Sequence, residues 1–275
     1  MSHPLLHPLR DAIGTEHLPY ADQPRIVSLV PSLTELICDL GLIANLVGRT
    51  GFCVHPREAL RTIAKVGGTK DVNVARVREL SPTHLIADID ENTREQVTAM
   101  MAFVPHVVVV NPRKLNDNLA LYSLLGGIFA RDKAAAKLIA GFQRARTELS
   151  TATNSLPRES VIYPIWRDPW MTVSRDTCIA DMLAAAGWDT LPVSPASRFP
   201  IFDWSSKEIA TAQRILLPSE PFVFKDQHVS EIRSLSNAPV TRIDGEMVSW
   251  YGSRAILAMR YLSNLRTHTC SRPRS

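Results

Sequence analysis

Short apolar runs alternate with amphipathic segments along the chain, a pattern that is typical of a parallel sheet covered by helices. In the first half, we expect strands at 25–30, 46–50, 84–88 and 106–110, and helices at 31–41, 74–80, 92–103 and 114–125. Gly41 is expected to close the first of these helices, and Gly126 and Gly127 the last, since glycine commonly follows a helix. The alternation predicts an α/β fold.

A longer helical pattern begins near Asp132, where apolar residues recur with a period of 3.6 over 132–151. At 1.5 Å per residue, such a helix is about 30 Å long, enough to bridge two lobes. The second half then repeats the first, with strands expected at 161–166, 171–173, 214–219 and 239–244, and helices at 176–188, 226–235 and 252–265. We therefore predict two parallel-sheet α/β lobes joined by a single long backbone helix, with a ligand cleft between the lobes.

These patterns also predict domain boundaries. We expect an N-terminal extension over 1–24, an N-terminal α/β lobe over 25–112, a helical linker over 113–155, a C-terminal α/β lobe over 156–266 and a basic tail over 267–275. The backbone helix of about 132–151 lies in the linker. Sequence length permits this division, because each lobe is long enough to bury its own core.

Composition and charge narrow the class of protein. An apolar content of 45% and a charged content of 21% are ordinary for a globular protein. The net charge of +4 comes from residues 250–275, which hold five arginines and no acid, so it does not indicate a nucleic-acid surface. No segment reaches the roughly 18 apolar residues of a membrane span. The N-terminal residues do not resemble a signal peptide, so we expect a cytoplasmic protein with reduced cysteines.

Aromatic and charged side chains gather where strands are predicted to end. Trp166 and Trp170 flank Arg167 and Asp168 directly after one strand. Other predicted turns carry Arg198, Phe199, Trp204, Trp250 and Tyr251. Flat rings and arginine suit a broad π-system or a hydrophobic chelate. The alternative is that Trp166 and Trp170 close the top of a lobe core.

The segment GFCVHP contains the best candidate pair of metal ligands, Cys53 and His55, preceded by Phe52. Thiolate and imidazole together suit zinc, copper or cobalt, but a closed site usually needs three or four ligands. A third ligand could come from His84, His106 or His228, and the alternative is a structural loop. The acids of DIDEN (88–92) either take part in chemistry or cap the helix that follows. The sequence contains no recognisable set of catalytic residues.

The chain resembles the periplasmic binding proteins for vitamin B12 and ferric siderophores, the helical-backbone metal receptors, over about 25–265. The matching segments, in order, are RIVSLVPSLTELICDLG, GRTGFCVHP, VGGTKDVNVARVRELSPTHLIADIDEN, IWRDPWMTVSRDTCIADMLAAAGW, SRFP and WYGSRAILAMRYL. By position, the resemblance implies that one wall of the cleft is formed by Trp166, Arg167, Trp170, Arg198, Phe199, Trp250 and Tyr251. It implies that the other wall is formed by Phe52, Cys53, His55 and the 67–70 turn.

The function that the resemblance implies is non-catalytic binding of a metal chelate, with no covalent cofactor. The ligand would be a corrinoid such as cobalamin, a ferric siderophore or a related tetrapyrrole, and the chain would serve an ABC importer. An anionic chelate is favoured if the arginines that could line the cleft face it, namely Arg49, Arg167, Arg198 and Arg254. The alternatives are a cytoplasmic metallo-cofactor enzyme that uses Cys53 and His55, and a receptor for free metal ions.

Two departures from that family concern delivery of the ligand. Exported members carry an N-terminal leader, which this sequence does not show, so a periplasmic location would require a different start site. Members also present one carboxylate on each lobe to a membrane permease. The first of these positions is Ala75 here, and the second is Lys207 or Glu208. We therefore expect ligand capture to be preserved and permease docking to be weakened.

Overall fold

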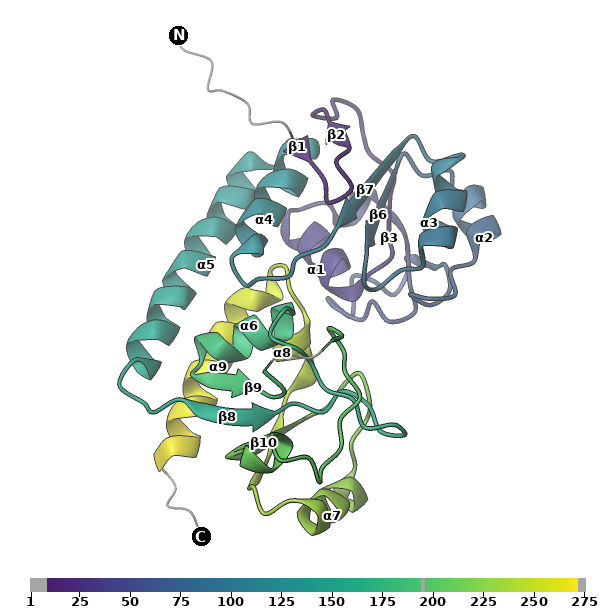
Figure 1. The fold of residues 1–275 in the computed structure, drawn as a ribbon. Helices are drawn as coiled ribbons and strands as arrows, with labels where there is room; N and C mark the ends of the chain where they lie inside the picture. Colours follow the sequence, from purple (N-terminus) through teal and green to yellow (C-terminus); the bar gives the residue numbers. More distant parts are fainter. Residues whose placement is uncertain (1–8, 194–195, 272–275) are drawn as a thin grey trace. The chain divides into compact units, whose positions relative to one another are not determined.

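The computed structural model describes residues 9–193 and 196–271 of the chain. Residues 1–8 and 272–275, which belong to the expected N-terminal extension and basic tail, lie outside the described residues. The chain divides into two compact units (Figure 1). Unit 1 comprises the described part of Met1–Pro112 with Asn116–Gly141 and Gly252–Arg254, and the remaining segments form unit 2.

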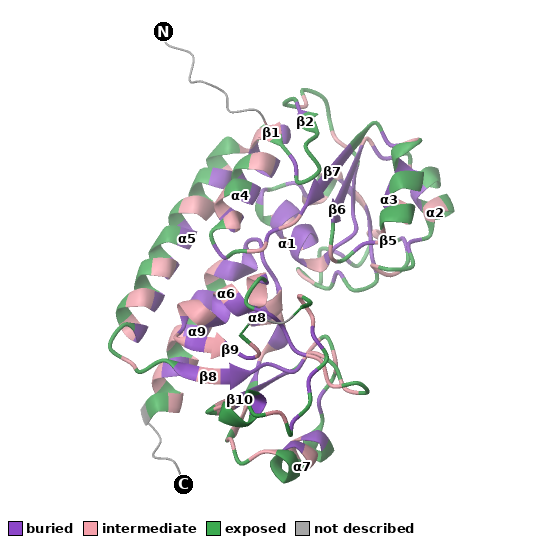
Figure 2. Ribbon diagram, viewed as in Figure 1, coloured by how far each residue is buried: buried purple, intermediate pink, exposed green. Residues whose placement is uncertain are grey.

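Unit 1 is built on a five-stranded parallel sheet in the order β5-β4-β3-β6-β7. The strands are β3 (Ile26–Ser28), β4 (Leu46–Arg49), β5 (Ala64–Lys65), β6 (His84–Asp88) and β7 (His106–Val110). The apolar strands β3, β6 and β7 are buried along most of their length (Figure 2), as expected for the centre of a sheet covered on both faces. The helices α2 (Val74–Glu79) and α3 (Arg94–Met101) pack on one face, with α1 (Pro31–Asp39) and α4 (Asp117–Ile128) on the other (Figure 1).

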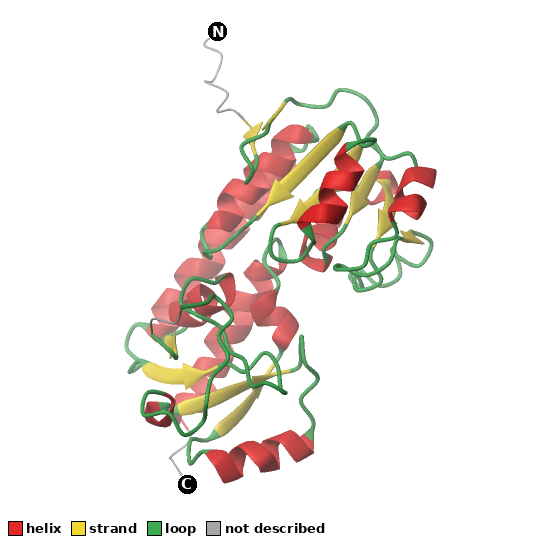
Figure 3. Cartoon of the chain, turned by 45° about the vertical axis from the view of Figure 1, so that its right-hand side comes forward, coloured by secondary structure: helices red, strands yellow, loops and turns green. Residues whose placement is uncertain are grey.

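Unit 2 contains a four-stranded parallel sheet in the order β11-β10-β8-β9. Its strands are β8 (Glu159–Ile162), β9 (Trp188–Thr190), β10 (Arg214–Pro218) and β11 (Val240–Ile243). Its helices are α6 (Cys178–Ala185), α7 (Asp226–Leu235), α8 (Gly245–Ser249) and α9 (Arg254–Ser271), with a 3-10 turn at Ile209–Thr211. The first residue of α9, Arg254, belongs to unit 1. Long loops join these elements (Figure 3). The two sheets confirm the predicted parallel-sheet α/β class.

The long helix predicted over 132–151 is present as α5 (Asp132–Thr153). Its residues are divided between the units after Gly141. Several shorter elements escaped prediction, among them α8, the 3-10 turn Ile43–Asn45 and a small antiparallel hairpin formed by β1 (Leu9–Arg10) and β2 (Glu16–His17). The last helix was expected to end near residue 265 but extends to Ser271.

The helix predicted over 114–125 is wrong at both ends, because α4 begins at Asp117 and passes through Gly126 and Gly127. A Cβ atom on Gly126 would lie 2.5 Å from the Cβ of Ala135, and one on Gly127 would lie 2.6 Å from Cδ2 of Leu9. Both distances are well below van der Waals contact. The glycines therefore permit close packing and do not end the helix.

The strand predicted at 171–173 is also absent. Met171 forms isolated bridges to Trp166 and Ile201 instead of joining the sheet. Residues 165–171 thus form a tight hairpin, in which the amide of Ile165 donates to the Met171 carbonyl and the Met171 amide donates to the Trp166 carbonyl. This hairpin presents the Trp166–Trp170 segment beyond the end of β8.

Candidate functional site

The loops that follow β8 and β10 lie at one edge of the unit 2 sheet. Because the two strands are parallel neighbours, their carboxyl ends meet there. The loop after β8 carries Trp166 and Trp170, and the loop after β10 carries Phe222 and Phe224. Rings from the connection between β9 and β10 and from α7 complete an aromatic array of Trp166, Trp170, Phe202, Trp204, Phe222, Phe224 and His228.

The array is continuous from the surface to the core of unit 2. Trp166 meets Phe222 edge-on with ring centroids 5.4 Å apart, and Phe222 lies 4.8 Å from Phe224. Phe224 in turn is parallel to Trp170, with centroids 6.1 Å apart and planes 2° apart. Such offset and edge-on contacts are the favoured aromatic geometries. Each ring is therefore held in place by contact with its neighbours in the array.

Burial differs between the two ends of the array. Trp166 is 45% exposed, and the neighbouring side chains of Ile201 and Val223 are 66% and 64% exposed. Trp170 is half-buried and packs against the unit 2 core. Of the two sequence interpretations, core closure therefore describes Trp170, whereas the ring of Trp166 is accessible at the surface of unit 2.

The arginines at this edge are bound to other groups of the protein. Arg167 donates to both carboxylate oxygens of Glu231 on α7, with Nε–Oε2 at 2.8 Å and Nη2–Oε1 at 2.9 Å, and also pairs with Asp168. Nε of Arg198 donates to the carbonyl of Asp176 at 2.9 Å, and its guanidinium lies 5.5 Å from the ring centroid of Phe199. Arg167 thus fastens the hairpin to α7.

Trp250 and Tyr251, which the resemblance placed at the ligand, are each 7% exposed. Nε1 of Trp250 donates to Oε1 of Glu220 at 2.7 Å, and Glu220 is the second residue after β10. Gly245 allows this arrangement, because a Cβ there would lie 2.5 Å from Cγ of Glu220. Trp250 therefore supports the loop that carries Phe222 and contributes little surface.

In unit 1, the loop 51–55 after β4 lies beside the 66–70 turn after β5. The amide of Gly51 donates to the carbonyl of Gly67 at 2.8 Å. Phe52 is 62% exposed and its ring lies over Gly68, whereas His55 is half-buried. Phe52 is thus the accessible ring at this edge of unit 1.

Cys53 is fully buried. Its sulfur accepts a hydrogen bond from Oγ1 of Thr34 at 3.0 Å and lies 3.2 Å from Oγ1 of Thr50. Burial raises the pKa of the Cys53 thiol, despite these hydrogen bonds, which lower it. A protonated thiol enclosed by threonine hydroxyls is a poor metal ligand.

The histidines considered as third ligands are placed elsewhere. His84 and His106 begin β6 and β7, at the amino ends of the strands, whereas Cys53 follows the carboxyl end of β4. His228 belongs to unit 2. Within residues 9–193 and 196–271, no three His, Cys, Asp or Glu side chains are grouped so that they could hold a metal ion.

We expect Cys53 to be inert in the folded protein. Native alkylation with iodoacetamide, followed by peptide mapping, should modify the exposed Cys270 about 100-fold faster than Cys53, and denaturation should remove the difference. A Cys270→Ser variant identifies the fast signal. The metal content of Cys53→Ser should equal that of the wild type. Rapid native modification of Cys53, or metal lost from Cys53→Ser, would contradict this assignment.

The acids of 88–92 do not cap α3, contrary to one sequence interpretation. Oδ1 of Asp88 accepts hydrogen bonds from the amides of Asp90 and Glu91, and the Asp88 amide donates to Oδ1 of Asn92. The N-cap of α3 is Thr93. The acidic segment therefore stabilises its own turn at the end of β6.

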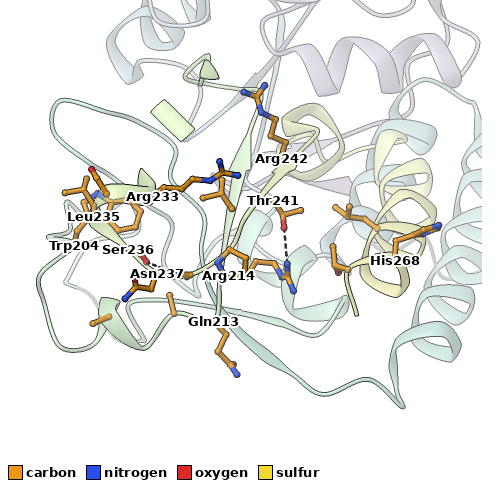
Figure 4. A pocket seen from close by; sticks show the side chains of 18 residues that line it. Trp204, Gln213, Arg214, Arg233, Leu235, Ser236, Asn237, Thr241, Arg242 and His268 are labelled. Atoms are coloured by element: carbon orange, nitrogen blue, oxygen red, sulfur yellow. Dashed lines mark hydrogen bonds between the residues drawn. The ribbon is translucent and has the colours of Figure 1, made fainter. Parts of the chain in front are cut away.

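A hollow of about 1200 Å³ in unit 2 lies at the amino ends of β10 and β11 (Figure 4). Its cationic side chains have structural roles. Arg214 donates to Thr241 and Glu159, and Arg242 pairs with Asp226. Arg233 lies in the last turn of α7, where a positive charge complements the helix dipole. Trp204 also lines this hollow, but the strands β10 and β11 reach it with their amino ends, whereas Trp166 follows the carboxyl end of β8, so we do not assign the ligand to the hollow.

Comparisons with known proteins agree on one family. The family model described as periplasmic binding protein matches residues 26–209. The vitamin B12-binding protein of Photorhabdus laumondii is 25% identical over 181 residues, which are 62% of either chain, so the match spans about three fifths of that relative.

Solved structures share the fold. The periplasmic vitamin B12 binding protein BtuF of Vibrio cholerae superimposes with a TM-score of 0.76 at 14% identity, covering 90% of this chain and 98% of that one. The periplasmic heme-binding protein RhuT of Roseiflexus gives a TM-score of 0.74 at 20% identity, covering 91% and 100%. Across the described residues, every helix is too short or too polar to cross a lipid bilayer.

Proposed function

This chain belongs to the periplasmic binding protein family, and from that premise we propose that it is a receptor for a metal chelate of the corrinoid type. The family and its structural neighbours are non-catalytic solute-binding proteins. The observation that carries the proposal is the aromatic array, which ends in an exposed tryptophan supported by Phe222. A flat, largely apolar macrocycle would gain area burial and ring contacts on such a surface.

The arginines argue for a corrinoid rather than an anionic chelate. Arg167 is occupied by Glu231, and Arg198 by the carbonyl of Asp176. In unit 1, Arg49 donates to the carbonyls of Leu60 and Thr50 and is 7% exposed. Arg254 forms a bidentate pair with Glu35, in which both N–O distances are 2.8 Å. Heme propionates or an acidic siderophore would have to displace these partners, whereas the amide side chains of a corrinoid would not.

Equilibrium dialysis tests the preference for a corrinoid over an anionic chelate. Purified protein is dialysed against cyanocobalamin, dicyanocobinamide, hemin and an anionic ferric siderophore at equal concentrations and pH. We expect one corrinoid to bind at micromolar concentration or below, and at least about tenfold more tightly than hemin, a difference of about 1.4 kcal/mol. Tighter binding of hemin or of the siderophore would overturn the choice of a corrinoid while leaving a chelate receptor in place.

We also propose that the protein acts in the periplasm, as its family does, and delivers its ligand to an ABC permease. The cytoplasmic location expected from the N-terminal residues finds no support in the comparisons. Ala75 is exposed on α2, and Oε1 of Glu208 accepts a hydrogen bond from the amide of Val193. Weakened docking at Ala75 stays a prediction. A metallo-enzyme that uses Cys53 is not favoured, because the Cys53 thiol is buried and the relatives are not catalytic.

A further inference from the structure

A cluster of imidazole rings lies at the amino ends of the unit 1 strands, the edge opposite to Phe52. His84 and His106 are paired neighbours on β6 and β7, and their rings stack with centroids 4.7 Å apart and planes 23° apart. Tyr20 meets both rings edge-on, at 4.7 Å and 5.5 Å, and Phe129 meets His84 at 4.9 Å. His84 is 2% exposed. Two titratable rings therefore stack under an aromatic cover.

One ring of that cover, Tyr20, ends the N-terminal segment 9–20, whereas Phe129 follows α4. Segment 9–20 is hydrogen-bonded to the rest of unit 1 at a few points. The Ala12 amide donates to the Val109 carbonyl at 2.8 Å, and the Val109 amide donates to Oδ2 of Asp11 at 3.0 Å. The Tyr20 amide donates to the Ile128 carbonyl at 2.7 Å. The side chain of Leu9 also packs against Gly127 of α4, and the rest of segment 9–20 forms its own short hairpin. Its attachment therefore depends on these hydrogen bonds and on the packing of Leu9 and Tyr20.

The charged groups around the imidazole pair would do little to stabilise a positive charge on it. The carboxylate of Asp11 is shared between His17, at 3.3 Å from Nε2, and backbone amides. Asp22 and Arg131, of opposite sign, line the hollow beside Tyr20. Arg25 directs its guanidinium to the carbonyls of Leu80 and Ser81.

The hydrogen-bond partner of the His84 ring is an uncharged hydroxyl, since Nδ1 of His84 lies 2.9 Å from Oγ1 of Thr83. A second positive charge in this cluster would thus be opposed by the first and by burial.

We propose that the buried imidazole of His84, stacked on His106, forms an acid-sensitive latch, which holds segment 9–20 on unit 1 when His84 is neutral and releases it when His84 is protonated. In its released state, segment 9–20 would uncover His84 and let water solvate the charged ring. This part of the inference rests on the proposed periplasmic location, where pH follows the surroundings and a fall in pH would protonate His84.

The pH range of release follows from His84. Burial, followed by the charges of His106 and His17, lowers the pKa of His84 from 6.5 to about 4. A lowered histidine pKa means that the closed state is fully stabilised above pH 6.5 and loses that stabilisation as pH falls towards 4. The difference between the two pKa values corresponds to about a 300-fold change in the closed-to-open equilibrium.

Hydrogen exchange followed by mass spectrometry tests the latch on the full chain. Protection of peptides within 9–20, corrected for intrinsic exchange, should fall about 100-fold between pH 7 and pH 4.5. A peptide covering β4 should change far less. In His84→Phe/His106→Phe, protection of 9–20 should stay within about threefold over this range, and His268→Phe, in unit 2, should behave as the wild type.

Two results would overturn the proposal. One is constant protection of 9–20 in the wild type, and the other is an unchanged loss of protection in the double variant. Should the double variant fail to fold, His106→Phe alone decides, because His106 is exposed and its removal takes away the like charge beside His84. The release should then move to lower pH, and an unmoved midpoint would overturn the latch.

Discussion

Glu159→Gln is expected to destabilise unit 2 by about 3–5 kcal/mol, the usual cost of removing one partner from a buried ion pair. Oε2 of Glu159 lies 2.9 Å from Nε of Arg214 and 3.2 Å from Nη1 of Arg266. The same oxygen accepts a hydrogen bond from Nε1 of Trp188 at 3.1 Å. The Arg266 side chain is fully buried, with Trp188 stacked 5.3 Å from its guanidinium. Without Glu159, two enclosed arginines would lack a counter-charge.

Urea unfolding at pH 7 measures this effect, with Glu148→Gln as the matched control. Glu148 pairs with Arg260 on the surface, where both side chains are about half exposed, so its loss should cost less than about 1 kcal/mol. Burial alone would raise the pKa of the Glu159 carboxyl, but the two guanidinium groups outweigh burial and lower it. The stabilisation is therefore present at neutral pH and disappears as pH falls through that lowered pKa. Equal effects of both variants would refute a dominant role for the buried triad.

Trp166→Ala is expected to weaken chelate binding by about 10- to 100-fold and to leave the free energy of unfolding within about 0.5 kcal/mol of the wild type. The reason is that the Trp166 ring is 45% exposed, so it contributes ligand contact and little core packing. Trp170→Ala should instead cost about 2–4 kcal/mol of stability, because Trp170 packs against Phe224 and Trp204.

Isothermal titration with the chelate and urea unfolding separate these two effects. Trp166→Phe serves as the matched control, since it keeps an aromatic ring and should lose less than about fivefold in affinity. Wild-type affinity in Trp166→Ala would remove Trp166 from the ligand surface. Unchanged stability in Trp170→Ala would mean that the array is not part of the unit 2 core.

The sequence was informative about the fold where local pattern decided the structure. The run of valines in β7 and the 3.6-residue period of α5 suffice to predict a buried strand and a long helix. Prediction failed at Gly126 and Gly127, because their neighbours there, Ala135 and Leu9, are tertiary partners. A glycine that permits close packing and one that ends a helix look alike in sequence.

The candidate site was only partly predictable for a related reason. Trp166 stood out because two tryptophans flank an arginine and an aspartate directly after a predicted strand. Phe222 and Phe224 were missed, although they follow a predicted strand, because only the strand order places β10 beside β8 and brings their loops together. Strand direction separates His84 from Cys53, because His84 lies at the amino end of β6 and Cys53 follows the carboxyl end of β4. A count of metal-ligand types treats the two residues as equal candidates.

The most direct test of the central claim, that the array receives a chelate, is tryptophan fluorescence of the full-length protein titrated with cyanocobalamin, dicyanocobinamide and hemin. Each titration is corrected for absorption by the coloured ligand and repeated with Trp166→Ala. We expect saturable quenching at micromolar concentration or below by one chelate, with a stoichiometry near one, and a much weaker response in Trp166→Ala. Failure of all three to quench saturably, together with a transition metal co-purifying with the protein, would contradict a chelate receptor.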